Sequence, residues 1–128
     1  MKCLLDTHAF IWLSTDDERL SGKARNAILD IRTSLFLSSA SIWEMVIKTA
    51  LGKLKLPDHP ETFIRKQLVL AQIHELPVTF KHAFSLQQLP TYHKDPFDRM
   101  LVAQASVEKL TILTIDPLIA QYAVKTLW

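Results

Sequence analysis

The sequence of 128 residues is long enough for one domain, over residues 1–128, and leaves little room for a second. Hydrophobic residues make up 48% of it, enough for a substantial core, whereas the formal net charge of +2 gives little support for a polyanionic partner. The sequence has only two glycines, which excludes a glycine-rich phosphate-binding loop. Its single cysteine, Cys3, excludes an internal disulfide and a cysteine-based metal site. This use of cysteine is typical of proteins in the reducing cytosol.

Short apolar runs predict five β-strands, and "LTILTID" at residues 110–116 is the clearest because β-branched residues fill it. In chain order, the expected strands are residues 2–6, 33–39, 73–80, 110–116 and 124–128. Apolar residues at helical spacing predict helices over residues 20–31, 41–54, 59–72, 95–109 and 116–124. Strands that alternate with helices predict an α/β fold whose parallel sheet is covered on both faces.

The apolar N-terminal stretch "MKCLLDTHAFIWL" resembles neither a signal peptide nor a membrane anchor. Asp6 and His8 interrupt it, and it lacks a long hydrophobic region and a cleavage site of small residues. No other apolar run reaches the length of a membrane-spanning helix, so we expect no membrane association.

Two aspartates follow the first and fourth expected strands. Asp6 ends "KCLLD" and Asp116 ends "LTILTID", so both are predicted at the carboxyl ends of parallel strands, where open α/β sheets build their sites. Each aspartate also has a structural interpretation as a helix N-cap, Asp6 before Thr7 and Asp116 before Pro117. Taken singly, neither residue decides between the two roles.

Glu44 is equally ambiguous. The stretch from Ser41 to Glu44 matches a capping box, in which the glutamate binds a backbone N–H of its own helix. In "KDPFDRM", Asp95 before Pro96 has the pattern of an N-cap with proline at the first helical position. Asp98 then falls at the third position, where the helix dipole favours an acid but does not explain its place beside an apolar face.

The four acids Asp6, Glu44, Asp98 and Asp116 are predicted at one edge of one sheet. Four crowded carboxylates repel one another, and a divalent cation removes this repulsion. Oxygen ligands without cysteine favour Mg²⁺ or Mn²⁺ over Zn²⁺. Such an ion acidifies its water ligands, which is the chemistry of metal-dependent phosphodiester hydrolysis.

Four segments of the chain resemble PIN-domain ribonucleases, and among them the VapC toxins of type II toxin–antitoxin pairs. The segments occur in the family's order: "LLDTHAFIW", "LSSASIWEMVIKTALGKLKLP", "LPTYHKDPFDRMLVAQA" and "LTILTIDPLIAQY". The resemblance implies a three-layer α/β/α sandwich with a central, mainly parallel sheet of about five strands. It also implies a Mg²⁺- or Mn²⁺-dependent endoribonuclease.

The resemblance identifies the acidic quartet as Asp6, Glu44, Asp98 and Asp116, which would hold the metal and carry catalysis. Asp95 is not one of the four. Thr114 and Thr7 match hydroxyl positions near the metal, although a strand residue and a cap are ordinary alternatives. The resemblance further implies a cytoplasmic homodimer, a small VapB-type antitoxin as partner, and an RNA substrate, commonly tRNA or rRNA.

Two further residues adjoin the predicted site. His93 could touch RNA or orient an acid, with an ordinary loop histidine as the alternative, and Arg99 could contact phosphate or an acid, or form a structural ion pair. Trp12 and Trp43 lie in helical patterns, which favours core or dimer packing over base stacking. The basic residues around Lys48 are either a solvated face or a contact for the RNA backbone.

Two other functional classes remain open. A receiver-like phosphoacceptor domain shares the α/β pattern, but Asp6 is followed by Thr-His rather than a second acid, and no lysine closely follows Asp116. A non-catalytic PIN-fold module that binds RNA or protein is the second alternative, and the complete acidic quartet argues against it.

Overall fold

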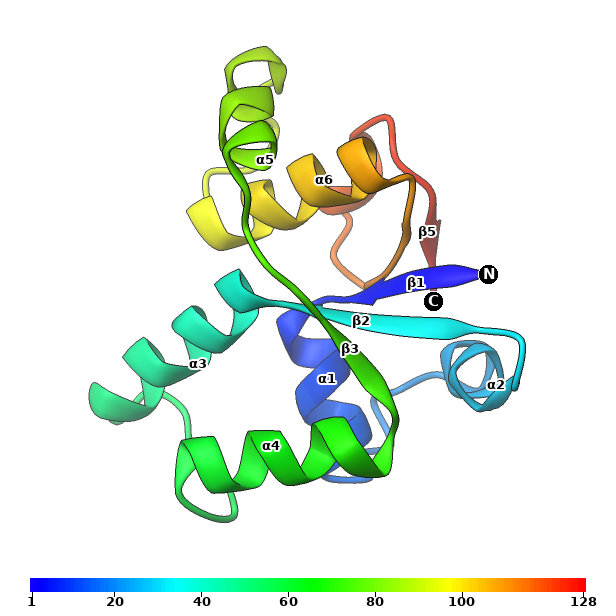
Figure 1. Ribbon diagram of the computed structural model, residues 1–128, viewed down its shortest axis with the longest axis vertical. Coiled ribbons are helices and arrows are strands. Elements are labelled where there is room, and N and C mark those ends of the chain that lie inside the picture. The colour runs from blue at the N-terminus through cyan, green and yellow to red at the C-terminus, as the bar shows by residue number, and fades with distance from the viewer.

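A five-stranded parallel sheet forms the centre of the computed structural model, which describes residues 1–128 (Figure 1). The strand order is β3-β2-β1-β4-β5, and all four neighbouring pairs are parallel. The strands are β1 (Lys2–Leu5), β2 (Ser34–Ser38), β3 (Ile73–Leu76), β4 (Thr111–Leu113) and β5 (Thr126–Leu127). The first strand of the chain is therefore the central strand of the sheet.

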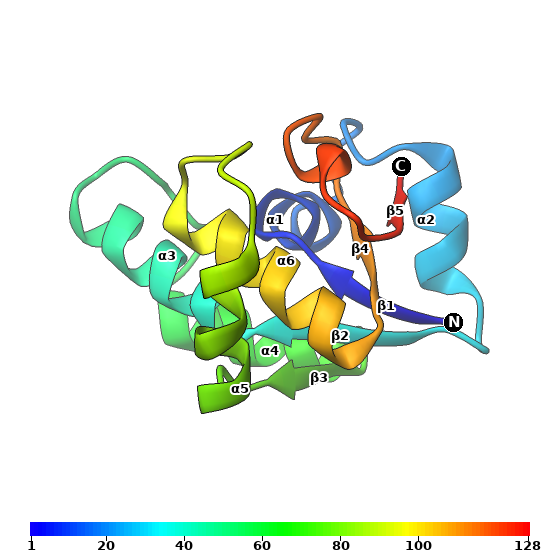
Figure 2. The same ribbon diagram turned by 90° about the horizontal axis from the view of Figure 1, so that it is seen from above.

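Helices cover both faces of this sheet, so the predicted three-layer α/β/α architecture is confirmed (Figures 1 and 2). The helices α1 to α4 lie on one side, and α5 and α6 lie on the other. Their bounds are α1 (Thr7–Ser14), α2 (Gly22–Leu29), α3 (Ser39–Ala50), α4 (Pro60–Leu70), α5 (Phe80–Ser85) and α6 (Pro96–Glu108). Two 3₁₀ turns, η1 (Leu86–Gln88) and η2 (Ile119–Gln121), complete the chain.

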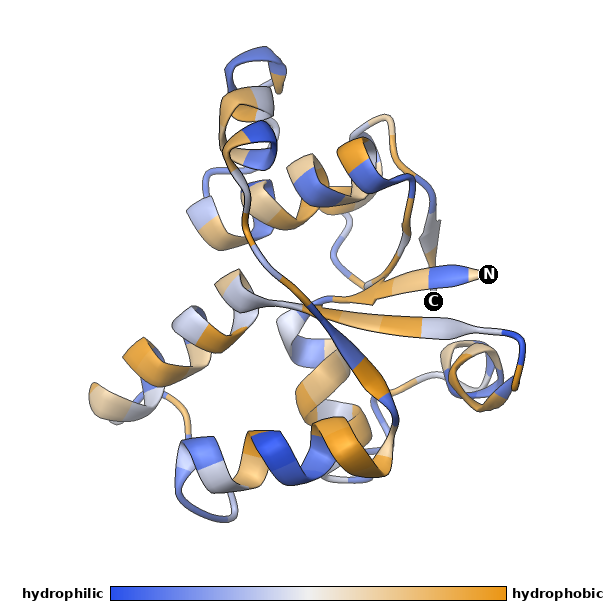
Figure 3. Cartoon of the chain, in the orientation of Figure 1, coloured by the Kyte–Doolittle hydropathy of each residue, from blue (hydrophilic) through white to orange (hydrophobic).

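The alternation of side chains along β1 divides the core into two parts. Cys3 and Leu5 pack into the cluster shared with the helices α1 to α4, whereas Leu4 packs into the cluster shared with α6. In register, Leu4 lies opposite Phe36 of β2 and Ile112 of β4. All three residues of the β1 interior are fully buried, which explains the continuous apolar run of this strand (Figure 3).

Several of the predicted elements differ from the structure. The strand expected over 73–80 ends at Leu76, and Thr79 then begins the unpredicted helix α5 with a capping box. The helix expected over 116–124 is only the 3₁₀ turn η2, and Ile119 and Tyr122, three residues apart, both enter the core. The helix expected to reach Ile31 ends at Leu29, and the Ile31 side chain is almost fully exposed.

None of the six helices has both the length and the hydrophobicity that crossing a membrane requires.

Candidate metal centre

The candidate centre lies beyond the carboxyl ends of β1 and β4. The chain runs from β1 to β2 and β3 on one side, and later returns to β4 on the other side of β1. A crevice forms where the strand order reverses in this way, and ligands bind there in open α/β sheets. Asp6 directly follows β1 and Asp116 lies shortly after β4, so the fold places both acids at this crevice.

Asp6 is both a helix cap and a buried member of the site. Its Oδ1 accepts a hydrogen bond of 2.7 Å from the Ala9 N–H, so it caps α1 as the sequence indicated. Burial raises the pKa of Asp6, while hydrogen bonds from the Thr114 hydroxyl and Ala9 oppose that rise. Thr114 also accepts a 3.0 Å hydrogen bond from the Asp116 backbone N–H. One buried hydroxyl therefore joins the two acids that follow β1 and β4.

Glu44 is held by two side chains rather than by a capping box. The helix α3 begins at Ser39 with Ser38 as its N-cap, which puts Glu44 in the second turn, so the predicted capping box is wrong. One carboxylate oxygen of Glu44 accepts a 2.7 Å hydrogen bond from the Thr7 hydroxyl, and the other binds the Lys48 ammonium. Glu44 is only 4% exposed and caps nothing, so helix capping does not account for it.

Asp95 caps a helix, whereas Asp98 is an acid of the site. Asp95 is the N-cap of α6, and its Oδ1 accepts a 3.0 Å hydrogen bond from the Asp98 N–H, with Pro96 at the first helical position. Asp98 projects into the site instead. Burial, and then the charges of Asp95 and Glu44, raise the pKa of Asp98 to about 7, while His93 opposes this rise.

His93 contacts two acids of the site at once. Its Nε2 lies 2.8 Å from Asp116 Oδ2 and 3.1 Å from Asp98 Oδ2. Asp116 keeps its other oxygen on the Leu118 N–H at 2.8 Å, which forms a short turn in place of the predicted helix cap. The ligand atoms of His93, Asp98 and Asp116 all lie within 4.8 Å of one another.

Arg99 supports the loop beside the site and binds no acid. Its guanidinium donates to the Pro90 carbonyl at 2.8 Å and to the Tyr122 hydroxyl at 3.2 Å. The Tyr122 hydroxyl in turn donates to the Pro90 carbonyl and accepts from the His93 backbone N–H. The ion pair considered for Arg99 is absent, and its guanidinium anchors the segment that carries His93.

The four predicted acids share one electrostatic environment, although they do not form one tight group. The charges of Glu44 and Asp6 act on Asp98, and the charge of Asp116 acts on Asp6. Asp6 and Glu44 have their own hydrogen-bond partners and stand outside the cluster of His93, Asp98 and Asp116. Lys48 is the one ammonium bound to these acids, which leaves an excess of negative charge. Such a set of oxygen donors fits Mg²⁺ or Mn²⁺.

Two residues of this arrangement were not recognised in the sequence as parts of the site. Lys48 was seen only as part of a basic cluster, although its i, i+4 spacing from Glu44 is the signal for this ion pair. Tyr122 carries no comparable signal, because it reaches the loop before α6 only through the tertiary fold. The contact of its hydroxyl with His93 joins positions far apart in the chain.

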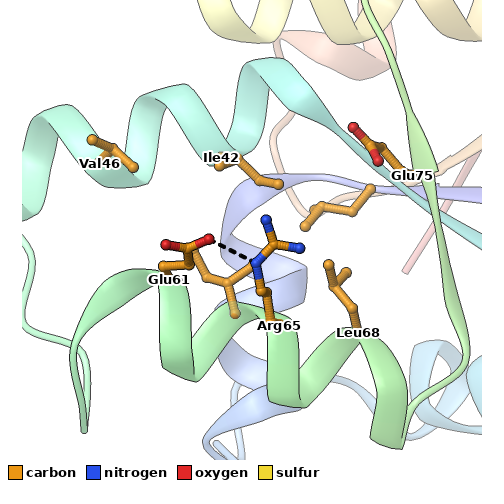
Figure 4. Close-up of a pocket in the computed structure, with 8 residues that line it drawn as sticks. Ile42, Val46, Glu61, Arg65, Leu68 and Glu75 are labelled. Atoms are coloured by element: carbon orange, nitrogen blue, oxygen red, sulfur yellow. Dashed lines mark hydrogen bonds and ion pairs between the residues drawn. The ribbon is translucent and has the colours of Figure 1, made fainter.

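The hollow between α3 and α4 is a separate feature (Figure 4). It encloses about 320 Å³, and Ile42 and Val46 line it from α3. These residues lie two positions before and after Glu44, roughly 200° around the helix from it, so the hollow opens on the other face of α3. Its Glu61 and Arg65 pair with each other at 2.7 Å, and no set of acids converges there.

The comparisons with known proteins agree with this fold. The family model of the PIN domain matches residues 3–125. A chain of the structure of VapBC2 from Rickettsia felis, bound to a DNA fragment from their promoter, has a TM-score of 0.73 and 15% identity, covering 99% of this chain and 98% of that one. A chain of VapBC-1 from nontypeable Haemophilus influenzae has a TM-score of 0.66 and 19% identity, with coverage of 99% and 97%.

A chain of FitAcB from Neisseria gonorrhoeae has a TM-score of 0.61 and 20% identity, with coverage of 98% and 96%. The search of curated proteins found no match. At these identities, the likeness to the solved structures shows a shared fold.

Proposed function

The chain belongs to the PIN domain family, and we propose that it is a metal-dependent endoribonuclease formed by one domain, residues 1–128. The observation that carries this proposal is the gathering of Asp6, Glu44, Asp98 and Asp116 at the crevice between β1 and β4. These side chains would hold Mg²⁺ or Mn²⁺. The bound ion supplies a Lewis acid for the phosphodiester and acidifies water at neutral pH.

The chain's own residues arrange this site before substrate arrives. Thr7 fixes one oxygen of Glu44, and Thr114 joins Asp6 to the backbone of Asp116. Fixed donors of this kind lower the reorganisation that catalysis would otherwise require. These hydrogen bonds therefore position Asp6, Glu44 and Asp116 in the absence of substrate.

Basic residues beside α3 would hold the RNA backbone. Lys53 and Lys55 are exposed just after this helix, and Lys48 lies on the same side as Glu44. Ammonium groups near a cleavage site neutralise phosphates without reading the sequence. The target, tRNA or rRNA as the resemblance implies, would then be selected by the shape of the surface around the crevice between β1 and β4.

We propose that the protein acts in the cytoplasm as the toxin of a VapBC-type pair and binds a small antitoxin of VapB type. The resemblance of the sequence supports this role, and similar folds occur in structures named VapBC2 and VapBC-1. A homodimer is also proposed. Trp43 is 63% exposed beside an apolar hollow that Val78 and Met100 line, and this arrangement favours packing against a second copy.

Cleavage of total small RNA by the purified protein tests the proposed activity. We expect a discrete product with Mn²⁺ or Mg²⁺, and no product with EDTA or with Asp6→Asn. Asp30→Asn is the matched control, because it neutralises a half-buried aspartate before the amino end of β2, at the opposite edge of the sheet from the acids.

Cleavage by Asp6→Asn at the wild-type rate would refute the proposal. Tight RNA or protein binding without cleavage under any metal would favour the binding module instead.

A further inference from the structure

His93 is a buried residue that joins the loop before α6 to two acids of the site. It is 9% exposed, so little of its ring is available to RNA. Its backbone N–H donates to the Tyr122 hydroxyl at 2.9 Å, and this hydroxyl is held in turn by the Pro90 carbonyl. The backbone of His93 is therefore fixed by Tyr122 in the absence of any ligand.

The hydrogen bonds of the ring define its tautomer. Nδ1 lies 3.1 Å from the backbone N–H of Asp95, which can only donate, so Nδ1 must present its lone pair. The proton of the neutral ring then belongs on Nε2. That nitrogen forms its hydrogen bond with Asp116 Oδ2 at 2.8 Å and lies 3.1 Å from Asp98 Oδ2.

This tautomer argues against His93 as a metal ligand, although its Nε2 lies within 4.8 Å of the ligand atoms of two acids. Metal binding through Nε2 needs a lone pair there and therefore a proton on Nδ1. A proton on Nδ1 would point at the Asp95 N–H and place two donors against each other. The local backbone thus disfavours the ligating form of the ring.

We propose that His93 is a positioning residue whose Nε2–H group donates to Asp116 and lies in direct contact with the Asp98 carboxylate, so that the ring sets the separation of the two acids. This proposal rests on the proposed function, since these acids are taken as ligands of the metal. One acid is carried by α6 and the other follows β4, and their charges repel. The Nε2–H group lies between them, bonded to Asp116 and in contact with Asp98, so it offsets that repulsion and sets their separation.

The segment from His93 to Asp98 then works as one unit. The backbone N–H of Asp95 selects the tautomer of His93, and the side chain of Asp95 caps the helix that carries Asp98. This accounts for an aspartate that the metal site itself does not use.

The first measurement is the ring tautomer in the metal-free wild-type protein, from the nitrogen chemical shifts of His93 by NMR. We expect a protonated Nε2 and an unprotonated Nδ1. A proton on Nδ1 would overturn the proposal. This result depends neither on RNA cleavage nor on metal binding, so it separates a failure here from a failure of the proposed function.

The second measurement is the affinity for Mn²⁺ by calorimetry in a matched pair of variants. His93→Gln can return an amide N–H near the position of Nε2, whereas His93→Asn offers an acceptor near Nδ1 and cannot reach both acids. We expect His93→Asn to weaken Mn²⁺ binding about 10- to 100-fold, the usual effect of losing a group that orients metal ligands. We expect His93→Gln to recover most of that loss.

Wild-type affinity in His93→Asn would overturn the positioning role. Electron spin-echo spectroscopy of the Mn²⁺ complex gives a direct test of ligation, since a coordinated imidazole nitrogen modulates the echo. We expect no such modulation in the wild-type protein, and its presence would identify His93 as a ligand and refute the proposal. If the wild-type protein binds no Mn²⁺, the proposed function fails. The tautomer measured by NMR then tests the proposed hydrogen bonding of His93 by itself.

Discussion

The ionised Asp98 carboxylate destabilises the folded, metal-free protein, and the change in the free energy of unfolding on Asp98→Asn measures this effect. Burial and the nearby acids raise the pKa of Asp98 from 3.8 to about 7. A difference of about three pH units corresponds to about 4 kcal/mol against the ionised folded state. The variant also loses the interaction of this charge with the start of α6, worth up to about 1 kcal/mol. We expect Asp98→Asn to raise the free energy of unfolding by about 2 to 3 kcal/mol above pH 7 without metal.

The gain depends on pH in a defined direction. Because the folded-state pKa of Asp98 lies above the unfolded value, the folded protein binds more protons than the unfolded chain between about pH 4 and pH 7. Asp98 therefore lowers wild-type stability as the pH rises through this range. The advantage of Asp98→Asn is complete above pH 7 and disappears near pH 4.

Thermal unfolding in EDTA at pH 8 and pH 4 checks both statements. A gain of this size corresponds to a Tm increase of roughly 6 to 15 °C at pH 8 for a chain of this length. Asp30→Asn is the control, since Arg32 lowers the pKa of Asp30 to about 2 and its loss brings no gain. Saturating Mg²⁺ should stabilise the wild type and reduce the difference. If Asp98→Asn is no more stable than the wild type at pH 8 in EDTA, the reasoning from crowded carboxylates is wrong.

Two further substitutions separate the roles of neighbouring residues. Lys48→Met removes the ammonium that competes with the metal for Glu44, so calorimetry should show tighter Mn²⁺ binding. Urea unfolding of the metal-free variant should show a loss of about 1 to 2 kcal/mol in the free energy of unfolding. Unchanged Mn²⁺ affinity would contradict the competition. Asp95→Ala should cost about 1 kcal/mol through the lost helix cap yet retain metal-dependent RNA cleavage, and complete loss of cleavage would show that Asp95 belongs to the metal site.

Much of the fold followed from local patterns. The continuous apolar run of β1 predicted a strand buried on both faces, and its interior residues are fully buried. Asp95 before Pro96 correctly predicted the start of α6. Elements whose form depends on distant contacts were missed. The segment after Asp116 has an apolar spacing compatible with a helix, but Ile119 and Tyr122 reach the core through a 3₁₀ turn.

The sequence predicted the positions of the site residues that follow strands. Asp6 and Asp116 could be placed at one edge because parallel strands share their direction. Glu44 was placed at that edge for the wrong reason, since its helix begins earlier than expected and its partners are Thr7 and Lys48. The contact of His93 with Asp116 joins a loop to the end of another strand, and no local pattern reports it.

The central position of β1 has a consequence for how the protein folds. The first strand of the chain pairs with β2 early in the sequence, but its other edge must wait for β4. Contacts between such distant segments close large loops and slow folding. A growing chain that has not reached Asp116 lacks one of the four acids of the crevice, and before β4 is made it also lacks the strand pairing on the other edge of β1. Synthesis order would therefore delay the proposed nuclease activity until nearly all of the domain has been made.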